Sequence, residues 1–389
     1  ADFLGQVDLF LLTSSSEGFS ISTIEAMAAG LPIVATRCGG PEEILTDGKN
    51  GLLLPVGNHQ KICDSLLQLS EDSCLARKMG KSARIDASLN YNVEATMDQY
   101  EDLFTKYKTG LRQTMASISN EKNILFMFHC EQNTGYAIQK LEAAFIRAAL
   151  QAGYQKQNIH NSFLKVFDES KNTHQINTCD ETTRHILECL IEDQTFDTIL
   201  AFDLQFPSWV SSLAHDNGIR VISYWGASMS SISHPLKLVL KKIEYWLFRN
   251  KAADSYVFES EAMLLTATHG RGIPKKLCKL IHLGVDTDQY SPAIDKSNFL
   301  HKEMGIPTDK KIVIYSGHME PRKGVGTIMQ CANHLAEQAL PCNLHFVLCG
   351  NKPGQEQPYI EMLSDEAKKM VTFAGYRNDL PDMMRASDI

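Results

Sequence analysis

The fold of this chain is decided by residues 17–30, which read EGFSISTIEAMAAG. Within this stretch Ser20 or Ser22 can cap the start of a short helix, and Gly30 can end that helix in a left-handed conformation. Apolar runs that are typical of buried strands lie before and after the stretch, at residues 7–12 and 31–36. The pattern therefore predicts a strand, a loop, a short helix and a second strand, which is one repeat of an α/β fold.

Two glutamates, Glu17 and Glu25, stand on either side of the expected helix start. The N-terminus of a helix that faces the end of a parallel strand attracts anions, because its N–H groups and its dipole point toward them. The two carboxylates can accept hydrogen bonds from sugar hydroxyls. A diphosphate-linked sugar would fit such a site, whereas an ordinary αβ unit with a capped helix is the simpler explanation of the same residues.

This stretch resembles the paired-glutamate signature of the retaining glycosyltransferases of family 4, which have the GT-B fold. The likeness rests on Glu-Gly-Phe, on the seven residues between the glutamates, on Glu-Ala-Met and on the following Gly-x-Pro-x-Val-Ala. It implies that Glu17 lies beside the transferred sugar, where it orients hydroxyls or stabilises positive charge, and that Glu25 holds the ribose. Donor contacts are also implied for the residues at the helix start, namely Gly18, Phe19, Ser20 and Ile21.

Composition limits the class of protein. The 389 residues are more than one core usually serves, so two or three domains are expected. A hydrophobic content of 43% and a charged content of 22% predict a water-soluble globular protein. The net charge of −8 argues against a nucleic-acid binder, and no apolar run is long enough to span a membrane. The ten cysteines lack metal-site spacing and, with no signal peptide at the start, favour a reducing cytoplasm.

Strands alternate with helices along the whole chain, which predicts parallel sheets. The pattern restarts at residue 123 and again near residue 286. The resemblance implies two Rossmann-like domains that face each other across a cleft. The predicted parts are the later part of a nucleotide-sugar domain (1–110), a linker (111–122), an acceptor-side domain (123–285) and the first part of a nucleotide-sugar domain (286–389).

Residues 317–324 carry a second likeness to the family. They read GHMEPRKG and resemble its phosphate-binding glycine-basic loop. The resemblance makes Lys323 the cation that meets the leaving diphosphate. The resemblance also implies a loop at Gly135 that closes over the donor and a loop at Gly375 near the nucleotide base. The other donor contacts that it implies lie in the glycine-basic loop, at Gly317, His318 and Arg322.

Two residues depart from the family pattern. His318 stands where the family usually has arginine, so one positive charge there depends on protonation of an imidazole. Arg322 could replace this charge, although its side chain should point away from that of Lys323. Trp225 follows a strand after which many members carry histidine, and it can either stack on a sugar or pack in the core.

The order of the segments differs from that in the family, because the segment like 371–389 normally comes directly before the one like 1–12. Two explanations fit: a window cut from two tandem glycosyltransferases, or a circular permutant in which 111–122 is the added connection. The two ends are complementary, so residues 1–110 are expected to complete the sheet that 286–389 begin. This ordering makes the predicted fold a GT-B fold with permuted segments.

The resemblance therefore implies a retaining glycosyltransferase that moves a hexose from a nucleotide-diphosphate sugar to a hydroxyl of a glycan, a lipid or a small molecule. The resemblance implies no metal and no other cofactor, and the charge implies no nucleic-acid partner. Two alternatives stay open. One is a catalytically idle tandem module or scaffold, and the other is a different GT-B enzyme such as a nucleotide-sugar epimerase.

Residues 236–251 form a basic, amphipathic segment. It could lie on an anionic membrane surface, or it could be an ordinary surface helix with solvated lysines. The predicted location is accordingly the cytoplasm, with a peripheral position at the inner face of the membrane as a further option.

Overall fold

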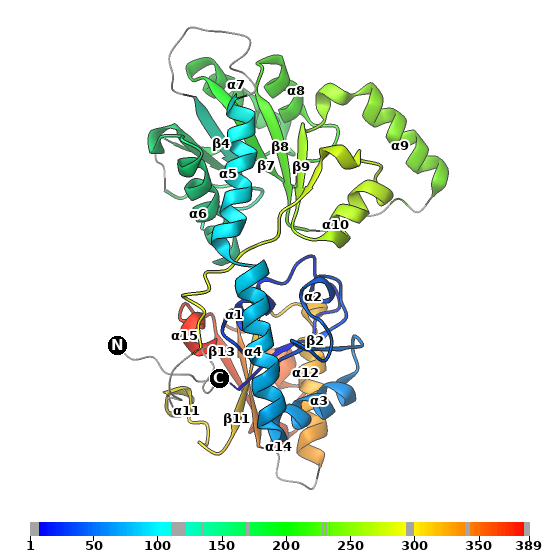
Figure 1. Cartoon of the computed structure of the whole chain (residues 1–389), viewed down its shortest axis with the longest axis vertical. Helices are drawn as coiled ribbons and strands as arrows, with labels where there is room; N and C mark the ends of the chain where they lie inside the picture. The colour runs from blue at the N-terminus through cyan, green and yellow to red at the C-terminus, as the bar shows by residue number, and fades with distance from the viewer. Residues whose placement is uncertain are drawn as a thin grey trace. The chain divides into compact units, whose positions relative to one another are not determined.

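A computed structural model describes residues 8–109, 122–133, 136–168, 172–227, 229, 232, 234–292, 299–338 and 343–384. The chain divides into two compact units. Unit 1 consists of residues 1–93 and 283–389, and unit 2 consists of residues 94–282. Unit 1 is therefore assembled from the two ends of the chain, which Figure 1 shows by the mixture of blue with yellow to red in its ribbons.

Unit 1 contains a sheet of six strands in the order β13-β12-β11-β1-β2-β3, and every pair in it is parallel. Its strands are β1 (Leu9–Leu12), β2 (Ile33–Thr36), β3 (Leu52–Leu54), β11 (Lys311–Ser316), β12 (Leu344–Cys349) and β13 (Val371–Gly375). Leu9 of β1 pairs with Val313 of β11. The expectation that the first segment completes the sheet of the last one is confirmed. The join is made at β11, while β13 forms one edge of the sheet.

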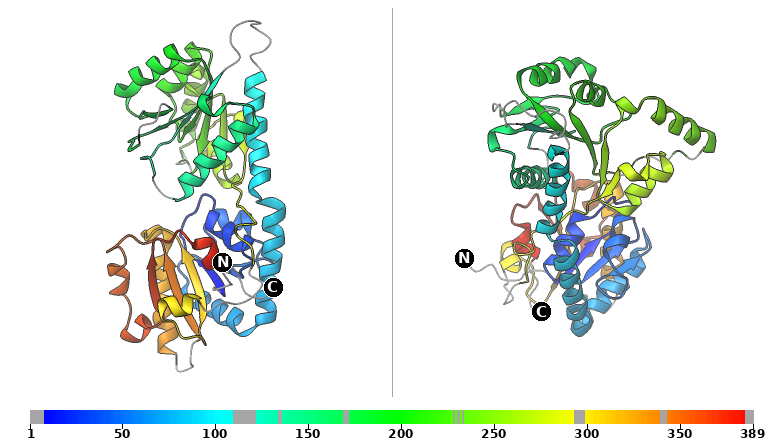
Figure 2. Two further views of the ribbon diagram at one scale, coloured as in Figure 1. Left: turned by 90° about the vertical axis from the view of Figure 1, so that its left-hand side faces the viewer. Right: turned by 45° about the horizontal axis from the view of Figure 1, so that its top comes forward.

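Helices cover this sheet, as the views of Figure 2 show. They are α1 (Ile21–Ala28), α2 (Gly40–Ile44), α3 (His59–Glu71), α4 (Ser73–Asn90), α11 (Phe299–Met304), α12 (Val325–Glu337), α13 (Gln357–Ile360), α14 (Asp365–Lys368) and α15 (Leu380–Met384). Ser20 stands at the N-cap position of α1, but its side chain makes no capping hydrogen bond to the helix backbone. Gly30 after the end of the helix has φ +75°, as the sequence predicts.

Unit 2 contains a parallel sheet of seven strands in the order β10-β9-β8-β7-β4-β5-β6. Its strands are β4 (Asn123–Met127), β5 (Ile159–Phe163), β6 (Thr173–Gln175), β7 (Phe196–Phe202), β8 (Arg220–Trp225), β9 (Ser255–Phe258) and β10 (Cys278–Leu280). Its helices are α5 (Val93–Thr109), α6 (Tyr136–Gln151), α7 (Arg184–Asp193), α8 (Trp209–Asp216), α9 (Pro235–Leu247) and α10 (Glu261–Leu265).

Apart from its first residue, Val93, helix α5 belongs to unit 2 and not, as a boundary at residue 110 would require, to unit 1. Its buried side chains Tyr100, Leu103 and Phe104 lie in one apolar cluster with Phe126 of β4 and Phe145 of α6. The ring centroids of Tyr100 and Phe145 are 4.9 Å apart. Burial of these aromatic faces fixes the helix to the second sheet, so the structural boundary falls at residues 93 and 94.

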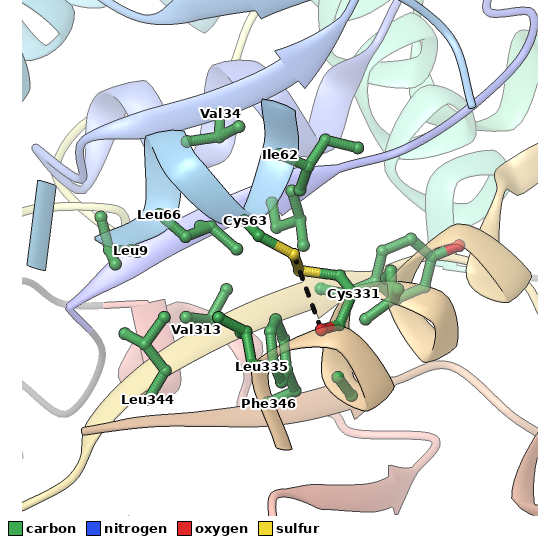
Figure 3. Close-up of a cluster of buried hydrophobic side chains, with 14 of the residues drawn as sticks. Leu9, Val34, Ile62, Cys63, Leu66, Val313, Cys331, Leu335, Leu344 and Phe346 are labelled. Atoms are coloured by element: carbon green, nitrogen blue, oxygen red, sulfur yellow. Dashed lines mark hydrogen bonds between the residues drawn. A yellow bond between two sulfur atoms is a disulfide. The ribbon is translucent and has the colours of Figure 1, made fainter. Parts of the chain in front are cut away.

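A disulfide joins Cys63 of α3 to Cys331 of α12. Both cysteines are fully buried, and Figure 3 shows the bond inside the apolar cluster of unit 1, among side chains that include Ile62 and Leu335. The partners are 268 residues apart in sequence, which is why their spacing gives no sign of the bond. This bond was not anticipated from the sequence.

Within the described parts of the chain, none of the helices has the length and apolar character that crossing a membrane requires.

Candidate functional site

The order of the strands in unit 1 determines where its site lies. The chain reverses its direction of winding between β11 and β1, which are adjacent in the sheet. In an open parallel sheet, ligands bind at the carboxyl ends of the strands at such a switch point. The loops that leave those ends are residues 317–324 after β11 and residues 13–20 after β1. The two stretches that the sequence singles out are therefore neighbours in space.

Glu17 and Lys323 form an ion pair at this switch point. Lys323 Nζ lies 2.7 Å from Glu17 Oε1 and 2.9 Å from Oε2. Ser14 Oγ donates a further hydrogen bond to Glu17 Oε1 at 2.6 Å. The side chains of Glu17 and Lys323 are only 7% and 17% exposed, respectively. The structure thus brings together the two residues that the sequence predicts to be catalytic.

The two loops are also joined through their backbones. Ser15 N donates to Arg322 O at 2.7 Å, and Thr13 Oγ1 donates to Gly324 O at 3.0 Å. Gly324 has φ +72°, and a Cβ atom placed on it would lie 1.8 Å from Thr13 O. Only glycine lets the two backbones approach so closely. Gly324 is the N-cap residue of α12, so the first N–H groups of this helix lie close after Lys323.

The backbone of Glu17 is also in close contact with the residues that follow β2. Gly40 N donates to Glu17 O at 3.0 Å, and Glu17 N donates to Cys38 O at 2.8 Å. A Cβ atom on Gly39, where φ is +106°, would lie 2.7 Å from Glu17 O. Burial raises the pKa of the Cys38 thiol to about 11, with a smaller contribution from the charge of Glu17, so this thiol is neutral at pH 7. Burial likewise raises the pKa of Tyr315.

Glu25 lies inside the unit rather than on an open surface. The residue is 3% exposed, and Tyr290 Oη donates a hydrogen bond to Glu25 Oε1 at 2.7 Å. Arg84 of α4 connects the same two segments, because its guanidinium donates to Ala28 O and, at 2.7 Å, to Tyr290 O. Tyr290 and Arg84 thus fix α1 to the chain near residue 290. The sequence pattern gives no sign of this hydrogen bond.

Replacing Tyr290 with phenylalanine is expected to disturb Glu25 without opening a cavity. Loss of a buried hydrogen bond to a charged group should lower the free energy of unfolding of unit 1 by about 1.5–3 kcal/mol. If Glu25 contacts the donor, the KM for donor should rise while kcat changes little. Tyr359→Phe is the matched control, because that hydroxyl bonds only a backbone carbonyl, at 3.4 Å. Equal KM values for both variants in steady-state kinetics would refute a positioning role for Tyr290.

The residues at the start of α1 are mostly buried. Phe19 is 7% exposed and packs against the ring of Tyr91, and Ser20 is 3% exposed. Ser20 Oγ accepts a hydrogen bond from Thr23 Oγ1 at 2.8 Å, so its hydroxyl already has an intrahelical contact. Gly18 and Ile21 are half-buried. Their predicted donor contacts stay predictions.

The other predicted residues of unit 1 are distributed around this core. His318 and Arg322 are exposed, and Arg322 Nε pairs with Glu320 Oε2 at 3.0 Å rather than joining Lys323. Gly317 stands at the end of β11, where its backbone carbonyl lies close to Gly350. Gly375 ends β13 with φ +70° and accepts a hydrogen bond from Gly350 N at 2.8 Å. The remaining predicted residue, Gly135, lies outside the described residues.

Unit 2 has a cavity of about 370 Å³ at the carboxyl ends of β7 and β8. Trp225 is among its lining residues, together with Phe206, Lys241, Tyr245 and Arg271. The indole N–H of Trp225 donates to Ser223 Oγ at 2.8 Å. Because Trp225 lines this cavity, a ligand bound there would contact it.

A buried carboxyl group at the same edge of unit 2 was not anticipated. Glu259 directly follows β9, is 5% exposed and is hydrogen-bonded to Tyr224 Oη. Burial, with a smaller contribution from the charge of Asp203, raises the pKa of Glu259 to about 8. The signal that could have revealed Glu259 is its position immediately after a buried strand.

The described part of the chain contains no group of three or more His, Cys, Asp or Glu side chains that could hold a metal ion.

Comparison with known proteins links unit 1 to one family. Residues 1–86 and 296–389 match the family described as Glycosyl transferases group 1. The N-acetyl-alpha-D-glucosaminyl L-malate synthase of Bacillus anthracis is 38% identical over 104 residues, which are 27% of this chain and 27% of that protein. The lipopolysaccharide core biosynthesis glycosyltransferase LpsE of Rhizobium meliloti (strain 1021) is 31% identical over 101 residues, covering 26% and 30% of the two chains. The matches thus span less than a third of either relative.

The fold has a counterpart among solved structures. A glycosyltransferase from Rickettsia africae ESF-5 superposes with a TM-score of 0.52 at 14% sequence identity, covering 69% of this chain and 72% of that one. At this identity the likeness concerns the fold alone. Together with the two parallel-sheet units, it assigns the chain to the GT-B class.

Proposed function

We propose that this chain is a glycosyltransferase that takes a sugar from a nucleotide-diphosphate donor and transfers it to an acceptor hydroxyl with retention at the anomeric carbon. The observation that carries this proposal is the ion pair between Glu17 and Lys323 at the switch point of unit 1. The match of both segments of unit 1 to the group 1 glycosyl transferases supports it.

The chemical demand of the reaction is stabilisation of the departing diphosphate. When the bond between the anomeric carbon and the phosphate oxygen breaks, its electron pair goes to the diphosphate and positive charge develops on the sugar. Lys323 and the N-terminus of α12 would meet the negative charge. Glu17 would face the positive charge or orient the sugar hydroxyls. These groups supply the charges without a metal ion, so we propose that the reaction needs none.

The acceptor is proposed to bind unit 2, where the cavity that Trp225 lines offers aromatic walls and two cationic side chains. One relative is named for an N-acetylglucosaminyl product of malate, and another is named for the lipopolysaccharide core. Hydroxylated small acids and glycans are therefore the first acceptors to test, and N-acetylglucosamine donors are the first sugars. The proposed location is the cytoplasm, where seven other described cysteines would remain as free thiols.

Mass analysis of products tests this function. The chain is incubated with UDP-, GDP- and ADP-sugars, alone and with candidate acceptors, and released nucleotide and new glycosides are measured. We expect one base to be preferred and the glycoside to keep the anomeric configuration of the donor. If the wild-type chain releases nucleotide no faster than the Glu17→Gln variant does with every donor, the result would instead favour the catalytically idle module. Conversion of one nucleotide sugar into another would favour an epimerase.

A further inference from the structure

Helix α9 of unit 2 exposes an unusual amount of apolar side chain. Although the helix has 13 residues, none of them is buried. Seven of the sixteen exposed large hydrophobic residues in the described parts of the chain lie on it or directly after it. They are Leu236, Val239, Leu240, Ile243, Trp246, Leu247 and Phe248. Figures 1 and 2 show α9 at the periphery of unit 2. Isolated exposed apolar residues are ordinary, whereas a cluster of this kind marks an interaction surface.

The six exposed apolar residues within the helix form a single stripe. At the helical repeat they span roughly 120° of its circumference, which is the width of one buried face. The opposite face is the one that contacts unit 2. Tyr245 and Phe206 have ring centroids 4.9 Å apart, and Lys241 Nζ lies 5.5 Å from the centroid of the same Phe206 ring. The helix therefore contacts unit 2 through the face that carries Lys241 and Tyr245, and its exposed apolar stripe points outward.

The charges beside the stripe indicate what covers it. Residues 235–251 contain five basic residues and one acidic residue, in a chain whose net charge is −8. Lys237 and Lys242 flank the stripe on its two sides, and the stem of Lys242 lies against Gly272. Long lysine side chains beside an apolar stripe can place their stems on it and their ammonium groups at lipid headgroups.

We propose that α9 is a membrane-docking helix that lies in the surface of a bilayer containing anionic lipids, with the stripe in the acyl region and the lysines at the phosphates. A protein partner would match the stripe equally well, but it would have to supply a matching acidic rim. A second copy of this chain would bring the same cations against each other. With one face held by unit 2 and 13 residues in length, the helix lies on the bilayer rather than through it. The inference does not depend on the glycosyl transfer proposed above.

Co-sedimentation with vesicles tests this inference on the whole chain, without any donor. Two vesicle types are used: phosphatidylcholine alone, and phosphatidylcholine with about one third phosphatidylglycerol. We expect the protein to pellet with the anionic vesicles at about 0.1 M NaCl and to be released from them in part at about 1 M NaCl. The double variant Lys237→Glu/Lys242→Glu should bind at least about twentyfold more weakly, since each lysine near the surface contributes to the attraction.

The apolar stripe is tested with Leu240→Glu/Ile243→Glu, which should abolish pelleting with both vesicle types. The matched controls are Leu89→Glu, which replaces a 73% exposed leucine on α4, and Lys78→Glu/Lys81→Glu on the same helix. Thermal melting verifies that all variants fold. Failure of the folded wild-type chain to pellet with anionic vesicles would overturn the proposal. So would equal binding by the α9 variants and their controls. Light scattering that shows a dimer dissociated by Leu240→Glu would assign the stripe to a second copy instead.

Discussion

Glu17→Gln is expected to lower kcat by about 10²–10³-fold while the affinity for free nucleoside diphosphate stays the same or rises. Loss of one preorganised charge at the reacting centre typically costs this much in rate. The substitution keeps the shape of the side chain and its contact with Ser14, but it removes the negative charge that holds Lys323 at 2.7 Å. The released lysine would then be more available to a diphosphate. Single-turnover kinetics and calorimetry measure the two quantities separately.

Two comparison variants make this result interpretable. Glu71→Gln, at an exposed glutamate that ends α3, should leave both quantities unchanged. Glu25→Gln should have the opposite pattern, with weaker nucleotide binding and little change in kcat, if Glu25 holds the ribose. If Glu17→Gln and Glu25→Gln have equal effects on turnover and on affinity, the two roles have been assigned incorrectly.

Gly324→Ala is expected to lower the free energy of unfolding of unit 1 by about 2–5 kcal/mol, and to abolish nucleotide binding at temperatures where the unit still folds. Two costs add in this variant. A left-handed conformation costs an L-residue about 1–2 kcal/mol, and the new Cβ, 1.8 Å from Thr13 O, forces the two site loops apart at a further cost of about 1–3 kcal/mol.

Gly57→Ala separates these two costs. Gly57 has φ +73°, close to the +72° of Gly324, but its Cβ would meet nothing within 4 Å. The control should therefore show only the conformational cost and should keep nucleotide binding. Chemical denaturation followed by circular dichroism measures both variants. Equal destabilisation in the two would mean that the loops after β1 and β11 tolerate separation, contrary to the close contact seen here.

Local pattern was sufficient to predict much of this molecule. The alternation of strands and helices predicted the parallel sheets, and the serines and Gly30 around residues 20–30 predicted the short helix with its left-handed residue after the end. Placing Lys323 beside Glu17 required one more step, the complementarity of the chain ends. That step is confirmed by the pairing of β1 with β11.

The features that sequence reasoning missed depend on contacts between distant segments. The Tyr290–Glu25 hydrogen bond joins residues 265 apart, and the bond between Cys63 and Cys331 joins residues 268 apart. Helix α5 shows an apolar face in its sequence, but the pattern does not say which sheet that face meets. Arg322 was expected to turn away from Lys323, and the structure shows the reason, because Glu320 pairs with it at the surface.

The central claim is that the two ends of the chain build one donor site whose cation is Lys323. Calorimetric titration of the whole chain and of Lys323→Ala with UDP, GDP and ADP tests it most directly. Because a charge-assisted contact contributes about 1.5–3 kcal/mol, we predict that the preferred nucleotide binds about 10- to 150-fold more weakly to the variant. Lys369→Ala, which removes an exposed lysine paired with Glu366 at 2.7 Å, should bind as the wild type does. Unchanged affinity in a folded Lys323→Ala variant, or no binding of any of the three nucleotides by the wild type, would contradict the claim.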